Sequence, residues 1–192
     1  MVRIMDMTRR RLLGELSSFT LSTTALSFAM GASRADAVTG YDPREDIFYL
    51  NKALAKEHNV IMSYDFSIET GLFEKIAFES FNFILTDHNR HKDLITGAIA
   101  KLGGDPAQPP SRDEFRKGFD AELIRTGSDA LRFNLRFEVE SYVVWSEIAT
   151  YIKDPTLVSM SANCAADEAI HRAILVTAKA SVPFDPTLRI RD

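Results

Sequence analysis

The sequence predicts an all-α protein, an antiparallel four-helix bundle with one long connection between its second and third helices. Three observations support this fold class. Apolar residues recur at alternating spacings of three and four along two segments that lie 81 positions apart, as in amphipathic helices. No segment shows the period-two alternation of a half-buried strand. The connections within each half are short, whereas more than twenty residues separate the halves.

The first two helices form one tight hairpin. The first is expected over about residues 46–69 and stops near Gly71, a residue type that favours the C-cap conformation. The second is expected over about residues 75–102 and ends at the Gly-Gly-Asp-Pro segment of residues 103–106, because Pro cannot continue a helix. So short a connection makes the two helices antiparallel neighbours.

The connection between the halves, residues 107–127, is about long enough to travel along the bundle. Its middle, residues 113–124, is expected to form a short helix with Ser111 as the N-cap. The third long helix is expected over about residues 129–153. A four-helix bundle with one such crossover is a recurring topology.

The fourth helix is expected over about residues 155–180, with Asp154 as its N-cap and Pro155 in its first turn. Because only a tight turn separates it from the third helix, this pair forms a second antiparallel hairpin. The tail from Val182 onward is expected to be irregular. The bundle core therefore covers about residues 46–180.

Residues 1–37 have the features of a removable export signal. Residues 8–14, Thr-Arg-Arg-Arg-Leu-Leu-Gly, form a twin-arginine pattern. A weakly apolar stretch follows over about residues 16–31, and Ala-Asp-Ala at residues 35–37 is a small-residue cleavage site. The stretch is short for a membrane span, so no stable span is expected after cleavage. An uncleaved anchor or a disordered tail is the alternative. The prediction is a periplasmic or exported protein that meets the twin-arginine translocase.

Composition limits what the remaining domain, residues 38–192, can be. The chain of 192 residues is long enough for one domain with a full core. Its formal net charge is −4, and the expected signal holds more basic than acidic residues, so the domain alone is more acidic still. That charge argues against a nucleic-acid partner. The single Cys164 excludes an intramolecular disulfide and a cysteine zinc cluster.

Each half carries one Glu within its apolar stripe, Glu57 in the first helix and Glu138 in the third. Carboxylates rarely enter a core without a cation or a proton, because desolvation costs several kcal/mol. A Glu at the edge of the stripe that reaches solvent is the alternative for either one. Glu140 is the second choice on the third helix, although it departs from the stripe.

A second repeat lies on the expected second and fourth helices, where short titratable motifs recur 80 positions apart. The matched residues are Asp87, His88 and His91 in the first half and Asp167, Glu168 and His171 in the second. Residues three apart share one helical face, so Glu168 and His171 can bind one metal or two adjacent metals. Counted from the turns, the motifs lie at the depth of the two stripe Glu residues.

The first-half motif differs from the second, since His88 stands where a symmetric site would have a Glu. A histidine ligand would lower the negative charge of the site, which favours one metal, or zinc or copper, over a di-iron pair. Asp87 could instead reach inward together with His91. A satisfied core histidine beside a solvent-facing carboxylate is the structural alternative for each motif.

Tyr64 and Trp145 each lie one heptad after a stripe Glu. Two interpretations are open: hydrogen-bonding or redox-active groups beside the metals, and aromatic packing at helical spacing.

These segments resemble a known family. Residues 50–57 resemble the first helix of bacterioferritins and related ferritin-like proteins. His91 followed by residues 103–106 resembles the end of their second helix, and residues 154–171 resemble the last helix of exported ferritin-like proteins that include desiccation-related proteins. The resemblance covers about residues 46–180 and implies a ferritin-like bundle.

The resemblance also implies a di-iron ligand set, with terminal Glu ligands, histidine nitrogens and a bridging Glu. All positions of that set except His88 match. The candidate metal ligands are Glu57, His88, His91, Glu138, Glu168 and His171.

The function that follows is an exported metal-binding protein of ferritin-like type, acting in iron oxidation or in dioxygen or peroxide chemistry as a ferroxidase or oxidoreductase. Iron is the first choice of metal, and manganese, zinc and copper remain open. The alternative is a non-catalytic, metal-binding, stress-protective or structural bundle with a degenerate site. Apart from metal ions, a homodimer is one option for a partner.

Overall fold

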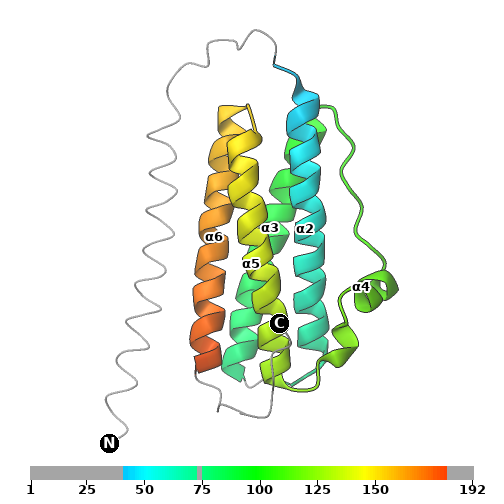
Figure 1. Cartoon of the computed structure of the whole chain (residues 1–192), viewed down its shortest axis with the longest axis vertical. Helices are drawn as coiled ribbons and strands as arrows, with labels where there is room; N and C mark the ends of the chain where they lie inside the picture. The colour runs from blue at the N-terminus through cyan, green and yellow to red at the C-terminus, as the bar shows by residue number, and fades with distance from the viewer. Residues whose placement is uncertain (1–40, 73–74, 181–192) are drawn as a thin grey trace, which may run out of the picture. The chain divides into compact units, whose positions relative to one another are not determined.

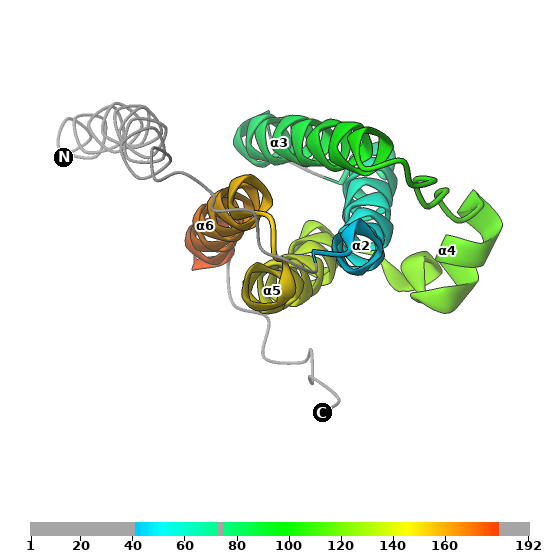
Figure 2. The ribbon, with the colours of Figure 1, turned by 90° about the horizontal axis from the view of Figure 1, so that it is seen from above.

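The computed structural model describes residues 41–72 and 75–180, and all the regular secondary structure of this part of the chain is helical, without strands. The long helices lie side by side in Figure 1, and Figure 2 shows them from above at the corners of a bundle. They are α2 (Pro43–Glu69), α3 (Lys75–Lys101), α5 (Gly127–Tyr151) and α6 (Pro155–Ala180). Each neighbouring pair runs antiparallel, which confirms the predicted fold class.

Two of the helices begin earlier than expected because capping residues precede them. Asp42 accepts a hydrogen bond from the backbone N–H of Arg44 at 3.0 Å, so α2 starts at Pro43. Thr126 and Asp129 form a capping box at the start of α5, two residues before the expected first residue. Both signals are present in the sequence, but the apolar periodicity alone does not include them.

The fourth long helix, α6, begins at Pro155 as predicted. Asp154 Oδ1 accepts hydrogen bonds from the backbone N–H of Thr156 at 2.7 Å and from that of Leu157 at 3.4 Å. The turn is also tied to the start of α2, because buried Asp46 accepts from the backbone N–H of Lys153 at 2.8 Å. This contact fixes the two hairpins at a common depth.

The crossover corrects one prediction. Residues 113–124 do not form one short helix but two pieces, α4 (Arg112–Gly118) and the 3-10 helix η1 (Ala121–Leu123). They are separated at Asp120, whose φ of 56° is left-handed and incompatible with a continuous helix. Ser111 caps α4 through a capping box, as predicted.

The crossover covers one part of the seam between α2 and α5. The ring of Phe115 on α4 lies 5.6 Å from that of Phe66 on α2 and 5.7 Å from that of Phe137 on α5, centroid to centroid. The other half of the same seam, toward the start of α2, has no such cover from α4 (Figure 1).

Two apolar clusters lie at different depths of the bundle, and a polar layer separates them. The first cluster includes Leu50, Leu54, Ile95, Ile99 and Ile148. The second includes Val60, Phe81, Ile84, Leu131 and Leu175. The buried layer between them contains the candidate ligands. Dry, close-packed layers on both sides limit the access of water to these charges and lower the local dielectric constant.

The predicted export signal, residues 1–37, and the tail from Val182 lie outside the described residues. Among the helices that are described, none is sufficiently long and apolar to cross a bilayer.

Candidate metal centre

The structure brings the six candidate ligands together in the middle of the bundle, with contributions from all four long helices. None of their side chains is more than 1% exposed. They are Glu57 from α2, His88 and His91 from α3, Glu138 from α5, and Glu168 and His171 from α6. The apolar stripes and the depth of the motifs are sufficient to produce this convergence.

The six residues form two overlapping groups, and within each group the ligand atoms lie within 4.8 Å of one another. Both groups share His88 and Glu168, and they differ in one Glu and one His. The first group is Glu57, His88, His91 and Glu168, and the second is His88, Glu138, Glu168 and His171. Two adjacent cation sites with a common carboxylate are the pattern of a two-metal carboxylate protein.

Several nitrogen and oxygen atoms in this layer that could coordinate a metal ion lack a hydrogen-bond partner. They test whether the residues fit metal ions. Among the described residues, the buried polar side-chain atoms without such a partner are His91 Nδ1, His171 Nδ1, Glu138 Oε2, both carboxylate oxygens of Glu168, and Ser141 Oγ. All but the last belong to candidate ligands. Buried donors and acceptors left unpaired cost about 1–3 kcal/mol each, and more when charged. Their convergence therefore fits a site that cations complete.

Glu168 occupies the central position between the two groups. Its Oε1 lies 3.4 Å from His91 Nδ1, and its Oε2 lies 3.7 Å from His171 Nδ1. Each carboxylate oxygen thus faces the imidazole of a different group. This is the arrangement expected of a bridging carboxylate.

Two aspartates on the outer side hold the inward-facing histidines by their other nitrogens. His91 Nε2–H donates to Asp167 Oδ2, and His171 Nε2–H donates to Asp87 Oδ2, each at 3.2 Å. The pairing is reciprocal, because each aspartate belongs to the helix opposite its histidine. These bonds place a proton on Nε2, so that Nδ1 is the nitrogen that would coordinate a metal ion.

This pairing settles one alternative and adds a residue that the sequence interpretation missed. Asp87 does not reach inward beside His91 but hydrogen-bonds His171 from outside. Asp167 carries the same role for His91, and its position in the repeat was the available signal. Arg90 connects both aspartates: its Nη2 donates to Asp167 at 2.8 Å and to Asp87 at 3.3 Å.

Replacing either outer aspartate by asparagine is expected to weaken metal binding about 10- to 100-fold, which is the usual cost of losing such a support. In Asp167→Asn the amide cannot stabilise the positive charge that a metal induces on His91. The measurement is a competition titration against a chelator of known affinity. Asp93→Asn is the matched control, since Asp93 lies on α3 with 76% of its side chain exposed. An affinity of Asp167→Asn equal to that of the control would contradict the assigned role.

His88 lies at the centre and contacts both stripe carboxylates. Its Nδ1–H donates to Glu57 Oε2 at 2.8 Å, and its Nε2–H donates to Glu138 Oε1 at 3.1 Å. Because carboxylates only accept, both nitrogens carry protons and the ring is an imidazolium. Burial by itself lowers the pKa of His88, but the charges of Glu168, Glu138 and Glu57 raise it to about 10.

The pKa values of the three buried carboxylates shift in opposite directions. Burial raises the pKa of Glu57, yet His88 and His91 outweigh burial and lower it to about 2. The pKa of Glu138 is lowered in the same way by His88 and His171. For Glu168, burial prevails and the pKa is raised. In the metal-free protein, protonated histidine therefore balances the charge of the carboxylates in the layer, in place of metal ions.

The shifts predict where the metal-free protein is most stable. The raised pKa of His88 contributes stability that is complete below about 6.5 and is lost as pH rises toward about 10. The lowered pKa of Glu57 contributes stability that is present above about 4.5 and is lost as pH falls toward 2. The midpoint temperature of thermal unfolding of the metal-free protein should therefore be highest between these pH values, at about pH 4.5–6.5. A midpoint that is still rising from pH 7 to pH 10 would contradict this protonation state.

Tyr64 and Trp145 make hydrogen bonds to the stripe carboxylates, each to the Glu of the other half. Tyr64 Oη donates to Glu138 Oε1 at 2.5 Å, and Trp145 Nε1 donates to Glu57 Oε1 at 2.7 Å. Both rings are also buried in the core, so each residue both hydrogen-bonds a carboxylate of the layer and packs as a core aromatic. The bonds orient the carboxylates while leaving Glu138 Oε2 unpaired.

Glu140, the second choice on α5, lies away from the layer. Its carboxylate is 42% exposed and pairs with Lys56 and Arg136. Glu138 is fully buried, and Trp145 lies two turns further along the same helix. The geometry therefore favours Glu138.

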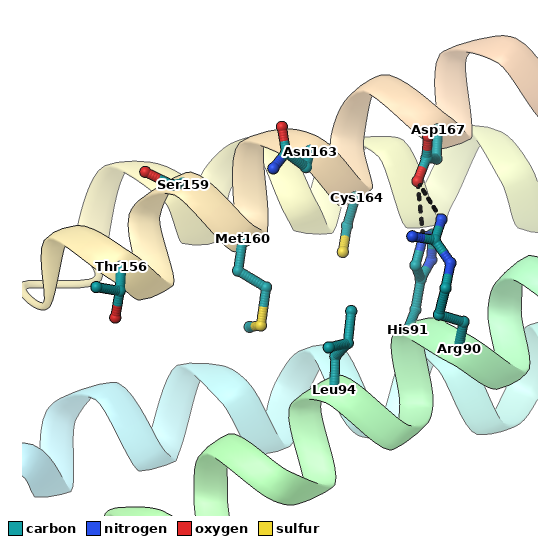
Figure 3. Close-up of a pocket in the computed structure, with 9 residues that line it drawn as sticks. All are labelled: Arg90, His91, Leu94, Thr156, Ser159, Met160, Asn163, Cys164 and Asp167. Atoms are coloured by element: carbon teal, nitrogen blue, oxygen red, sulfur yellow. Dashed lines mark hydrogen bonds and ion pairs between the residues drawn. The ribbon is translucent and has the colours of Figure 1, made fainter. Parts of the chain in front are cut away.

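A small pocket between α3 and α6 reaches the edge of the layer. Its volume is about 280 Å³, and Figure 3 shows His91 and the Arg90–Asp167 pair at one end, with Leu94 and Cys164 beside them. Cys164 is 2% exposed, and burial raises the pKa of its thiol, so it stays neutral. The pocket therefore lies directly beside His91.

A four-helix bundle with one crossover and a central carboxylate–histidine layer defines a ferritin-like protein with the residues of a two-metal site. The sequence model of the ferritin-like domain family matches residues 45–180, and the chain belongs to that family. No curated protein matches the chain in sequence.

Solved structures agree in fold. A conserved hypothetical protein from Mycobacterium tuberculosis has 16% identity, with 76% of this chain and 98% of that one covered and a TM-score of 0.66. The dodecameric thioferritin, a bacterioferritin-related protein from Bacteroides fragilis, has 21% identity, 73% and 87% coverage and a TM-score of 0.62. A ferritin-like, diiron-carboxylate protein from Bacillus anthracis has 21% identity, 73% and 99% coverage and a TM-score of 0.59.

Proposed function

We propose that the chain binds two metal ions side by side in the buried layer and that iron is the preferred metal. The observation that carries the proposal is the set of unpaired donors, which divides into one imidazole nitrogen and one Glu168 oxygen for each ion. Glu57 and His91 would hold one ion, Glu138 and His171 the other, and Glu168 would bridge them. Mixed carboxylate and imidazole ligands suit iron, although manganese and zinc share them.

A pair of irons supplies redox chemistry, here iron oxidation or the reduction of dioxygen or peroxide. The protein's own contribution is positional. Trp145 and Tyr64 orient the terminal carboxylates, and the outer aspartates orient the imidazoles. The apolar clusters above and below exclude water, and the pocket beside His91 admits small molecules. A ferroxidase or related oxidoreductase is the function that we infer.

The experiment is oxygen consumption after addition of ferrous iron to the purified protein, followed with an oxygen electrode. Consumption that saturates at about two irons per chain would support the proposal. The control is Glu140→Ala, which alters an exposed carboxylate outside the layer. Rates no higher than those of iron in buffer would leave metal binding without oxidation.

One observation favours a second candidate, a metal-binding bundle without turnover. His88 replaces a carboxylate at the centre and holds both stripe carboxylates by hydrogen bonds. Two metal ions would require His88 to lose a proton and its hydrogen bonds to these carboxylates. A single zinc ion in one of the two ligand groups demands less rearrangement. Zinc bound in preference to iron, with no oxygen consumption, would identify this candidate.

We also propose that the protein is exported through the twin-arginine pathway, which the arginine pattern of residues 8–14 and the cleavage site at residues 35–37 support. Replacing Arg9 and Arg10 by Lys is expected to keep the full-length chain in the cytoplasm. Cell fractionation with immunodetection measures this. Equal amounts of mature-length protein in the exported fraction for both versions would refute the proposed route.

A further inference from the structure

A second cavity lies on the outer seam between α2 and α5, in the half that the crossover leaves open. Its volume is about 380 Å³, within the range of small-molecule sites. The cavity lies away from the Phe115 contacts, toward Tyr49 near the start of α2 and Tyr151 at the end of α5. It shares no lining residue with the candidate metal ligands.

One wall of this α2–α5 cavity is flat and aromatic. The rings of Tyr49 and Tyr151 stack with centroids 5.0 Å apart and an interplanar angle of 9°. Tyr151 is 49% exposed, so the stacked pair remains accessible. The aliphatic side chains of Val144 and Ile148 complete the apolar surface. Such a wall suits a planar ring.

The polar groups of the cavity carry both signs. Lys52 supplies an ammonium whose Nζ lies 5.9 Å from the centre of the Tyr49 ring, so it stands beside the flat wall. Lys56 also lines the cavity, but its ammonium is paired with the carboxylate of Glu140. Glu147 supplies a carboxylate, and Asn59 supplies an amide. An anionic ligand would face Glu147, and a cationic ligand would face Lys52. A neutral ring with hydroxyl groups satisfies both, since a hydroxyl donates to a carboxylate and accepts from an ammonium or amide.

The cavity lies against the same helical segments that build the candidate metal centre. Its lining residues Lys56 and Val144 directly precede Glu57 and Trp145, and Trp145 Nε1 donates to Glu57. Trp145 is also the only tryptophan of the chain. A ligand in the cavity therefore contacts the residue next to Trp145 in the sequence, so that the fluorescence of Trp145 can report its binding.

We propose that the α2–α5 cavity is a binding site for a small neutral aromatic molecule bearing two hydroxyl groups, of the dihydroxybenzene class. The ring stacks on the tyrosine pair, and its hydroxyls pair with Glu147 and Lys52. Binding is independent of metal ions, so the proposal does not require the metal centre to be loaded.

The test is a titration of metal-free, full-length protein with hydroquinone in the absence of oxygen. Trp145 fluorescence and calorimetry are both recorded. Hydroquinone is chosen because, unlike 1,2-dihydroxybenzenes, it does not chelate metal ions. We expect saturable binding that Tyr151→Ala weakens about tenfold through loss of the stacking surface. Glu147→Gln should weaken it severalfold. Tyr142→Ala is the matched control, because Tyr142 is a similarly exposed tyrosine of α5 outside the cavity.

Three results would overturn the proposal: no saturable binding, equal loss in Tyr151→Ala and Tyr142→Ala, or benzoate binding as tightly as hydroquinone. A variant with Glu168→Ala and His171→Ala should bind hydroquinone like the parent protein. Retained hydroquinone binding together with lost metal binding in that variant would separate this site from the proposed metal centre. Circular dichroism of each variant verifies that the helical fold is intact.

Discussion

A variant with both Glu168→Ala and His171→Ala is expected to bind no metal in the buried layer. The two substitutions remove the central carboxylate, which both ligand groups share, and one of the two imidazole nitrogens that face it. His88 stays an imidazolium between Glu57 and Glu138 and offers no free nitrogen. One proposed ion then keeps Glu57 and His91, and the other keeps only Glu138. Since structural and catalytic metal sites use three or more protein ligands, the remaining groups cannot hold an ion tightly.

The measurement is metal content after reconstitution and desalting, with the parent protein and Glu140→Ala treated in parallel. Glu140→Ala removes an α5 carboxylate that pairs with Arg136 at the surface, and it should retain the full metal content. Thermal unfolding of the metal-free proteins verifies folding. A double variant that binds as much metal as the parent would show that the ions bind elsewhere.

His88→Glu is expected to have the second large effect, and its direction depends on the metal. Without metal, the substitution replaces an imidazolium by a carboxylate between Glu57 and Glu138. Removing one partner of a buried ion pair costs about 3–5 kcal/mol, because the other charge stays buried and unpaired. The melting temperature of the metal-free protein should fall by about 10 °C or more.

With metal, the same variant should recover, since the added carboxylate restores the symmetric pattern that His88 interrupts. Binding to the folded state raises the melting temperature by mass action. Scanning calorimetry with and without ferrous or manganous ions measures the melting temperatures of the metal-bound and metal-free variant. His88→Gln is the control, because it removes the imidazolium without adding a charge. A metal-free His88→Glu protein as stable as the parent would show that His88 carries no positive charge in this layer.

The fold was predictable because each signal acts locally. Apolar spacing placed the helices within a few residues, and Gly, Pro and Asp at the ends of helices placed the turns. The misjudged crossover shows the limit of that reasoning. Nothing periodic distinguishes one short helix from two, and no sequence signal places the left-handed conformation at Asp120, where the helix is interrupted.

The site was predictable in part for the same reason. Depth and stripe position bring the six ligands together, because residues level with each other in a bundle meet at its axis. The outer contacts were not predictable, since the partner of His91 is Asp167 on another helix. Sequence spacing describes one helix at a time and does not show which side chains bond across the seam. As a metal ligand His88 would be neutral, whereas the three buried carboxylates around it make it a cation in the metal-free protein.

The measurement that tests the two-metal proposal most directly is the metal stoichiometry of the parent protein. Protein loaded anaerobically with ferrous iron and freed of excess metal is analysed by plasma mass spectrometry, and Mössbauer spectroscopy reports whether the irons are coupled. The proposed centre predicts about two irons per chain with the spectrum of a coupled pair after oxidation. No bound metal after reconstitution, or a single isolated ion, would contradict it.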